Sequence, residues 1–233
     1  MGRAKTILCV ASTLVALSAS ARAADLPEII QQPASAVEQL GSTWYLRGDI
    51  AYRFNAASRA DWNGLAVADP GLGSAFAAGA GIGAKMGWLR IDATADYAFP
   101  SQFQGSVPAL ATFSGNISSV VVLANAYADL GTWHSFTPYV GAGVGVAGVR
   151  TAGFTNTFVQ PPAGISGTDQ WTFAWALMAG VGYSVAPNVL IDLGYRYLHL
   201  GDASSGIDQF GAVLTAHGLA ASEVRLGVRY TVE

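Results

Sequence analysis

The glycines Gly143, Gly145 and Gly148 have the Gly-x-Gly-x-x-Gly spacing of a dinucleotide-binding turn. Such a turn follows a strand, starts a helix that holds the pyrophosphate, and is followed about 20 residues later by an acidic residue. The segment VRTAGFTNTF, which follows Gly148, lacks the apolar spacing of a helix. Gly143 and Gly145 instead alternate with Val144 and Val146, which places both glycines on one face of a strand. We therefore expect them to make room for large side chains of the facing wall, not to bind a nucleotide.

The three histidines are the next candidates for chemistry. His199, with the Ser204–Ser205 pair just beyond it, would suit a lipid-hydrolysing barrel enzyme, and His217 with Phe210 would suit a haem site. His134 lies far from both in the sequence, and no two histidines have the spacing of metal ligands. We favour structural roles for all three. The sequence therefore predicts no enzyme, and no catalytic, cofactor-binding or metal-binding residue.

Acidic and basic residues are interleaved along several segments. Paired carboxylates can act as general acid and base, but here arginines lie among them. Interleaved opposite charges are more typical of a structural network of ion pairs. The expected lumen charge network contains seven basic and six acidic residues: Arg47, Asp49, Arg53, Lys85, Arg90, Asp92, Asp96, Asp129, Asp192, Arg196, Glu223, Arg225 and Arg229.

The elements that carry these charges are predicted to be strands. Large apolar residues alternate with small or polar ones over segments of about ten residues, which is the period of two typical of strands. Leu46 and Tyr52, for example, share one face while Arg47 lies on the other. Eight such segments are predicted: 44–54, 75–87, 89–99, 118–130, 137–149, 171–186, 189–198 and 223–232.

The connections between these segments alternate in length. Long polar connections are expected at 55–74, 100–117, 150–170 and 201–221, and short turns near 87, 131–132 and 187–188. Outer-membrane barrels have this asymmetry, with short periplasmic turns and longer outer loops. The pattern predicts an all-β fold: an eight-stranded antiparallel up-and-down transmembrane β-barrel, with both termini in the periplasm.

Composition indicates which face meets lipid. Of the 233 residues, 52% are hydrophobic and only 12% are charged, against roughly 25% in soluble domains. An Arg or Lys that faces lipid at the membrane midplane costs about 2–4 kcal/mol, so the charged face must line the lumen. Aromatic residues at strand ends, such as Trp44, Phe54, Phe99 and Tyr230, fit the two membrane interfaces.

The N-terminus has the features of an export signal. Arg3 and Lys5 precede an apolar stretch, and Ala21–Ala23 fits the small-x-small cleavage rule. We expect residues 1–23 to be a cleaved signal peptide, residues 24–42 a periplasmic tether and residues 43–233 the barrel. Cleavage removes the only cysteine, Cys9, and leaves nine basic residues against fifteen acidic ones. This balance offers no basic surface for nucleic acid.

Several segments resemble the porin-like small outer-membrane β-barrel proteins of alphaproteobacteria, relatives of the OmpA-type eight-stranded barrel. They are ARAADLP, WYLRGDIAYRF, NAYADLGTWHSFTPYVGAGVGVA, VLIDLGYRYLHLG and EVRLGVRYTVE. The resemblance implies an abundant surface barrel with roles in envelope integrity and host contact, and haem binding in some members. These proteins usually end on an aromatic residue, whereas this chain has Val232 in that slot, which puts efficient assembly in doubt.

Because an eight-stranded barrel is barely wide enough for its own side chains, the charges are expected to plug its lumen. The predicted function is structural and surface-interacting in the cell outer membrane. The alternative is a small passive porin for ions or small solutes, and a haem-binding or lipid-modifying barrel comes third. The expected partners are outer-membrane lipid and lipopolysaccharide, the barrel-assembly machinery, and an extracellular ligand or host surface at the long loops.

Overall fold

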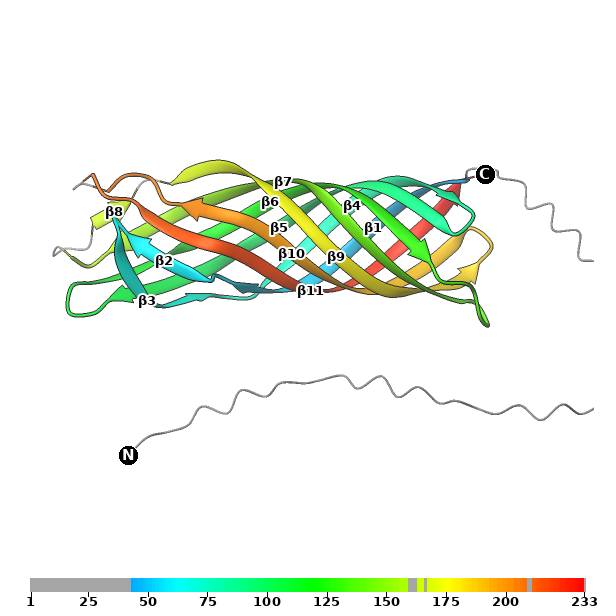
Figure 1. The fold of residues 1–233 in the computed structure, drawn as a ribbon, viewed down its shortest axis with the longest axis horizontal. Coiled ribbons are helices and arrows are strands. Elements are labelled where there is room, and N and C mark those ends of the chain that lie inside the picture. Colours follow the sequence, from blue (N-terminus) through cyan, green and yellow to red (C-terminus); the bar gives the residue numbers. More distant parts are fainter. Residues whose placement is uncertain (1–42, 159–162, 166, 209–210, 233) are drawn as a thin grey trace, which may run out of the picture. The chain divides into compact units, whose positions relative to one another are not determined.

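Long antiparallel strands make up most of the structure (Figure 1). It is a computed structural model that describes residues 43–158, 163–165, 167–208 and 211–232, so the predicted signal peptide and tether lie outside the described residues. Within those ranges no helix is long and apolar enough to cross a membrane. The strands are β1 (Thr43–Ala56), β2 (Arg59–Trp62), β3 (Leu65–Leu72), β4 (Ala75–Met86), β5 (Leu89–Val107), β6 (Ala111–Asp129), β7 (Phe136–Asn156), β8 (Ala163–Ile165), β9 (Thr168–Ala186), β10 (Val189–Ser204) and β11 (Leu214–Val232).

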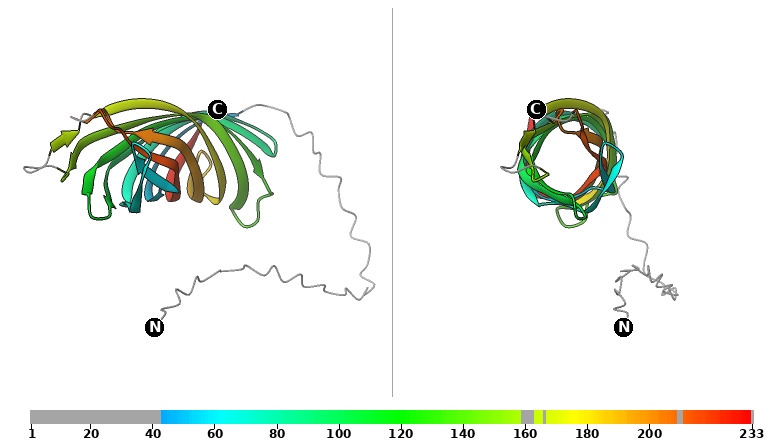
Figure 2. Two further views of the ribbon diagram at one scale, coloured as in Figure 1. Left: turned by 60° about the vertical axis from the view of Figure 1, so that its left-hand side comes forward. Right: turned by 90° about the vertical axis from the view of Figure 1, so that its left-hand side faces the viewer.

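Eight of these strands close a barrel. Each pairs antiparallel with the next in the order β1, β4, β5, β6, β7, β9, β10 and β11, and β11 pairs with β1 to complete the ring. The right-hand view of Figure 2 shows this closed ring. Each of the eight predicted segments is the core of one of these strands, so the predicted up-and-down barrel is confirmed.

Three of the four long connections are shorter than predicted, because much of each one continues the flanking strands, whereas the first, 55–74, contains the separate β2–β3 hairpin. Strands β5 and β6 run on to Val107 and from Ala111, which leaves a three-residue turn where residues 100–117 were expected to be a loop. The residues that face inward change from even to odd numbers where the β5–β6 register shifts between Ala98 and Ser101. A single alternating pattern cannot be followed across such a shift. The alternation in the sequence therefore predicts a strand that ends at Phe99.

At the end that carries these extensions, the β2–β3 hairpin replaces two strands of the barrel wall. Strands β1 and β4 end at Ala56 and begin at Ala75, and the β2–β3 hairpin takes their place between β11 and β5. Eight strands therefore surround the lumen here too: β11, β2, β3, β5, β6, β7, β9 and β10. The short strand β8 adds to β7 outside this ring.

Side-chain polarity divides the wall into two levels. At the lower level, which holds the short turns, exposed apolar residues cover the outside, with Trp44, Trp88 and Tyr230 towards one edge and Phe54 and Phe99 towards the other. At the upper level the outside of β5 and β6 is polar instead, and the inside is apolar. The outward residues there are Gln102, Gln104, Thr112, Ser114 and Asn116. The apolar outer band matches the lipid-facing band of a transmembrane barrel.

Candidate functional site

All thirteen residues of the predicted lumen charge network lie on the inner face of the lower level. Eleven are buried, Arg47 is largely buried, and only the Lys85 side chain, 42% exposed, reaches towards solvent. Each one forms an ion pair with another member of the set. Alternation along the strands turned these side chains inward, and closure of the ring brought together partners that are far apart in the sequence.

Glu223 is the centre of the upper part of this network. Its carboxylate accepts hydrogen bonds from Arg53 Nε (2.6 Å), Arg196 Nε (2.7 Å) and Arg225 Nη1 (2.8 Å), and the side chain is fully buried. Asp96 accepts from Arg196 Nη1 (2.8 Å) and Arg225 Nη2 (2.5 Å). Arg225 also pairs with Asp49. We call these six residues the Glu223 cluster: Asp49, Arg53, Asp96, Arg196, Glu223 and Arg225. Its three carboxylates balance its three guanidinium groups.

Asp92 is the centre of a second group of side chains, which lies below the Glu223 cluster in the same lower level. Its carboxylate accepts hydrogen bonds from Tyr45 Oη (2.9 Å), Arg47 Nη1 (3.1 Å) and Asn125 Nδ2 (2.7 Å). Arg47 Nη2 lies 3.1 Å from Asp49 and so links this group to the Glu223 cluster. The sequence prediction included the charged members of this group but not Tyr45 or Asn125. Their inward position on charged strand faces was the available signal.

The lowest part of the network combines ion pairs with aromatic rings. The Arg90 guanidinium lies 4.4 Å from the centre of the Tyr127 ring and 4.8 Å from that of Tyr139, within the range of cation–π attraction. Asp129 lies 3.3 Å from Arg90 Nη2 and 2.9 Å from Lys85 Nζ. Close by, Arg229 makes a two-pronged pair with Asp192, at 3.0 and 2.5 Å.

Glycines give these large side chains their room, as predicted. A Cβ atom on Gly143 would collide with the Asn125 amide, and one on Gly141 would collide with the Tyr127 ring. Gly145 also faces the lumen, whereas Gly148 faces outward against Trp171. The Gly-x-Gly-x-x-Gly motif is thus split between the two faces of β7, an arrangement that cannot cradle a phosphate group at a helix start.

Above the Glu223 cluster the buried side chains are mainly apolar, with Asn156 and Asp208 as polar exceptions next to Trp62, and the sequence prediction missed this change. Phe103, Phe113 and Phe154 are buried there, and Trp62 of the β2–β3 hairpin packs on Phe113 with ring centres 5.4 Å apart. The signal was present in FQGSV and ATFSGNI, residues 103–107 and 111–117, where apolar or small residues alternate with polar ones. The register shift hides the continuity of residues 103–107 with the rest of β5, and their β6 partners at 111–117 then lack a visible pairing strand in the sequence.

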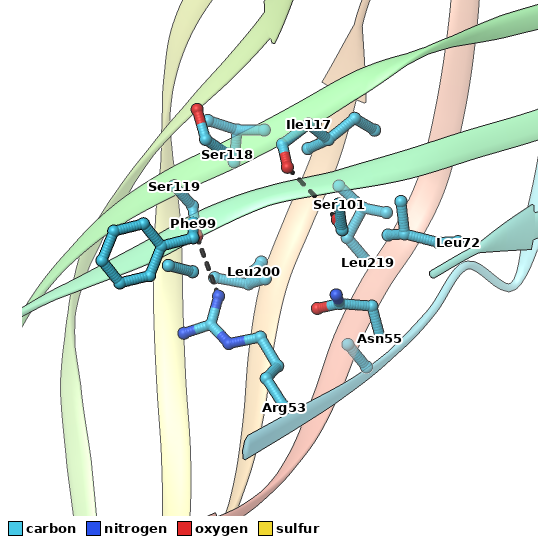
Figure 3. A pocket seen from close by; sticks show the side chains of 13 residues that line it. Arg53, Asn55, Leu72, Phe99, Ser101, Ile117, Ser118, Ser119, Leu200 and Leu219 are labelled. Carbon is cyan, nitrogen blue, oxygen red and sulfur yellow. Dashed lines mark hydrogen bonds between the residues drawn. The ribbon is translucent and has the colours of Figure 1, made fainter. Parts of the chain in front are cut away.

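The boundary between the charged and apolar parts holds a small cavity (Figure 3). Its volume is about 20 Å³, which is room for roughly one water molecule. Arg53 reaches into it from below, where Nη1 donates to Ser119 Oγ at 2.9 Å, while Leu200 and Leu219 line its apolar side. A second cavity of about 20 Å³ lies between Arg47 and Arg225.

Comparison with known proteins agrees with this geometry. Residues 8–231 match the family described as outer membrane protein beta-barrel domain. The chain belongs to this family. An uncharacterized protein of Brucella suis biovar 1 is 30% identical over 284 aligned positions, which cover 99% of each chain. The outer membrane protein PagN of Salmonella typhimurium is 32% identical over 116 positions, 46% of this chain and 47% of that protein.

A solved structure supports the same fold. The crystal structure of Neisserial surface protein A superposes with a TM-score of 0.53 at 22% identity, and the match covers 82% of this chain and 98% of that one. As a member of the outer-membrane barrel family, the chain is an integral protein of the outer membrane of Gram-negative bacteria. The predicted family, fold class and membrane location are therefore confirmed.

The histidines of this family member lie apart from one another. His199 is on the outer face of β10 and stacks on Trp175, with ring centres 5.6 Å apart. His134 sits in the β6–β7 turn, and His217 bridges Asp61 and Asp202 in the upper level. Phe210, the proposed aromatic neighbour of a haem at His217, lies outside the described residues. In the described part of the chain, no three His, Cys, Asp or Glu side chains are grouped as metal ligands.

Proposed function

We propose that this protein is a closed outer-membrane barrel that strengthens the envelope and presents its outer hairpins for surface contact, and that it does not conduct ions. The observation that carries the proposal is the filling of the lumen at two levels. Ion pairs engage all thirteen charges of the lower level, and buried apolar side chains fill the upper level.

Both levels oppose a continuous water path. In the lower level, a passing ion would have to displace partners of buried guanidinium and carboxylate groups, and breaking such a pair costs about 3–5 kcal/mol. In the upper level, water would have to wet buried aromatic and aliphatic side chains, which the hydrophobic effect opposes. The two cavities between these groups each have room for roughly one water molecule.

Surface contact would fall to the hairpin tips. Leu65, Leu110, Phe158 and Ile207 stand at four different outer connections, and each is more than 40% exposed. Exposed apolar residues grouped at one end of a protein are typical of a contact surface. We assign this end to the cell exterior and the end with the short turns, next to Thr43 and Val232, to the periplasm. Outer-membrane lipid and lipopolysaccharide surround the wall between these ends.

Single-channel recording in planar bilayers tests the closed lumen. The folded protein, verified by its heat-shifted band on a gel, should give no reproducible conductance steps. Arg47→Gln and Arg196→Gln should lower the stability of the barrel or let it begin to conduct, because each removes a partner from the network. If the unmodified protein conducts and these variants mainly change its ion selectivity, the protein is a small pore and the proposal is wrong.

A second test addresses surface contact separately. Cells that produce the protein should adhere to a host-cell layer, and Leu65→Ser with Ile207→Ser should reduce that adherence at equal surface abundance. Ser at these positions removes exposed apolar contact area and no buried side chain. Equal adherence of the variant and the unmodified protein would overturn this part of the proposal.

A further inference from the structure

The β2–β3 hairpin is held in the wall by short ladders on both sides. It turns at Asn63 and Gly64, which have φ angles of 49° and 85°, as a two-residue hairpin turn requires. It pairs with β11 through four residue pairs and with β5 through three, and the β5 side contains a register shift between Ala68 and Gly71. The hairpin nonetheless covers the apolar lumen, because Ala60, Trp62 and Val67 point inward and are buried.

A histidine joins this hairpin to the rest of the wall. Nε2 of His217, on β11, lies 2.7 Å from Asp61 Oδ1 on β2, and its Nδ1 lies 2.9 Å from Asp202 Oδ2 on β10. Both carboxylates are held by backbone groups as well. Gly64 N donates to Asp61 Oδ2 (3.1 Å), and Gly218 N donates to Asp202 Oδ1 (2.8 Å). The carboxylates are therefore fixed on either side of the imidazole ring.

Only a protonated histidine satisfies this geometry. Each ring nitrogen faces a carboxylate oxygen, which can only accept a hydrogen bond. A neutral imidazole has a single N–H group, so one nitrogen would present its lone pair to a carboxylate. The other charged group that faces the ring is Arg59, also on β2, whose positive charge opposes protonation.

We propose that Asp61, His217 and Asp202 form a proton-controlled clasp, which holds the β2–β3 hairpin in the wall when His217 is charged and loosens it when His217 is neutral. Loosening would uncover the apolar end of the lumen and change how the Leu65 tip is presented. This inference does not depend on whether the lumen conducts, because it concerns one hairpin above the charged network.

The direction of the pH effect follows from the three groups. Hydrogen bonds to Asp202 and then Asp61 raise the pKa of His217 above its ordinary value of 6.5. The backbone bond from Gly218 and then His217 lower the pKa of Asp202, and His217 lowers the pKa of Asp61. A raised histidine pKa gives stability that is present below the ordinary value and is lost as pH rises through the raised one. The clasp is therefore closed between the lowered carboxylate pKa values and the raised histidine pKa.

Hydrogen exchange of the folded protein in detergent micelles, followed by mass spectrometry over this pH range, tests the clasp. After correction for intrinsic exchange, protection of β2 and of residues 214–217 should fall as pH rises through the histidine pKa. The expected fall is about tenfold for each unit by which the pKa is raised. Amides in the lower part of β5 and β6 should show no such change.

Variants decide whether His217 is the cause. His217→Gln should remove the pH dependence of hairpin protection, and Asp202→Asn should shift its midpoint to lower pH. His199→Gln, a control on the outer face of the neighbouring strand, should keep the full dependence. The proposal is overturned if the unmodified protein shows no pH dependence in the hairpin, or if His217→Gln shows the same dependence. A His217 ring signal that titrates at or below 6.5 in an NMR spectrum would overturn it as well.

Discussion

The two levels of the barrel have opposite polarity. In the lower level the wall is apolar outside and charged inside, around Glu223 and Asp92. In the upper level it is polar outside, as at Gln102 and Asn116, and apolar inside, around Phe103. The backbone is the same antiparallel ladder in both. In each level, therefore, the outer and inner faces of the wall differ in polarity, with the sense of the difference reversed.

That contrast has a physical role in both levels. A register slip by one residue turns every side chain to the other face, so register is well defined only where the two faces differ. An apolar lumen at the lipid level would make both faces alike, and charges there make a slip costly. In the upper level, polar side chains outside and apolar side chains inside give the same protection against slipping.

The largest expected effect comes from removing the central carboxylate of the lower level. Glu223→Gln keeps the volume of the side chain but leaves Arg53, Arg196 and Arg225 without its charge. The free energy of unfolding, measured by urea titration in lipid vesicles, should fall by roughly 3–5 kcal/mol. A loss below about 1 kcal/mol, the range of exposed pairs, would mean that water screens the network and that the lower level is not dry.

A truncation in the upper level should have a more local effect. Leu214→Ala removes a buried side chain next to Trp62 and should cost about 2–5 kcal/mol. Hydrogen exchange should show lost protection in β2, β3 and the upper-level parts of β5 and β6. Leu226→Ala, on the lipid-facing side of the same strand, is the matched control and should leave that region unchanged. Uniform loss over both levels would mean that they unfold as one unit.

A lumen glycine should tolerate a methyl group poorly. Gly143→Ala drives a Cβ atom into Asn125, and such overpacking costs about 1–3 kcal/mol. Gly48→Ala is the control, because this strand glycine faces outward and the added Cβ atom would lie 4.0 Å from its nearest neighbour, the Gly79 carbonyl oxygen. Urea titration of both variants should show a loss only for Gly143→Ala. If Gly143→Ala were as stable as the unmodified protein, the inner wall would have free space for the methyl group, which would favour a pore.

The smallest effect is expected at an exposed ion pair. Arg150 Nε lies 3.6 Å from Asp169 Oδ1 on the outside of the barrel, and both side chains are about 70% exposed. Asp169→Asn should change the free energy of unfolding by less than about 1 kcal/mol. It is also the control for Glu223→Gln, since both replace a carboxylate by an amide. A large loss in Asp169→Asn would show that burial does not explain the difference between the two pairs.

Much of the barrel was predictable from local pattern. The period of two in WYLRGDIAYRF places Arg47, Asp49 and Arg53 on one face whatever the rest of the chain does. Because a charge facing lipid is costly, the inward direction of that face follows from the apolar composition of the other. Strand number, the inner face of β7 with its glycines, and all thirteen lumen charges were accessible in this way.

Tertiary structure alone decided the partners and the upper level. Arg53 and Glu223 are 170 residues apart, and they meet only because β11 pairs with β1 in one register when the ring closes. The β2–β3 hairpin enters the wall only because β1 and β4 end early, and the shift at Ala98 reverses which residues of β5 face inward. Alternation is a property of neighbouring residues, whereas closure, register shifts and the clasp at His217 depend on strands that the sequence keeps far apart.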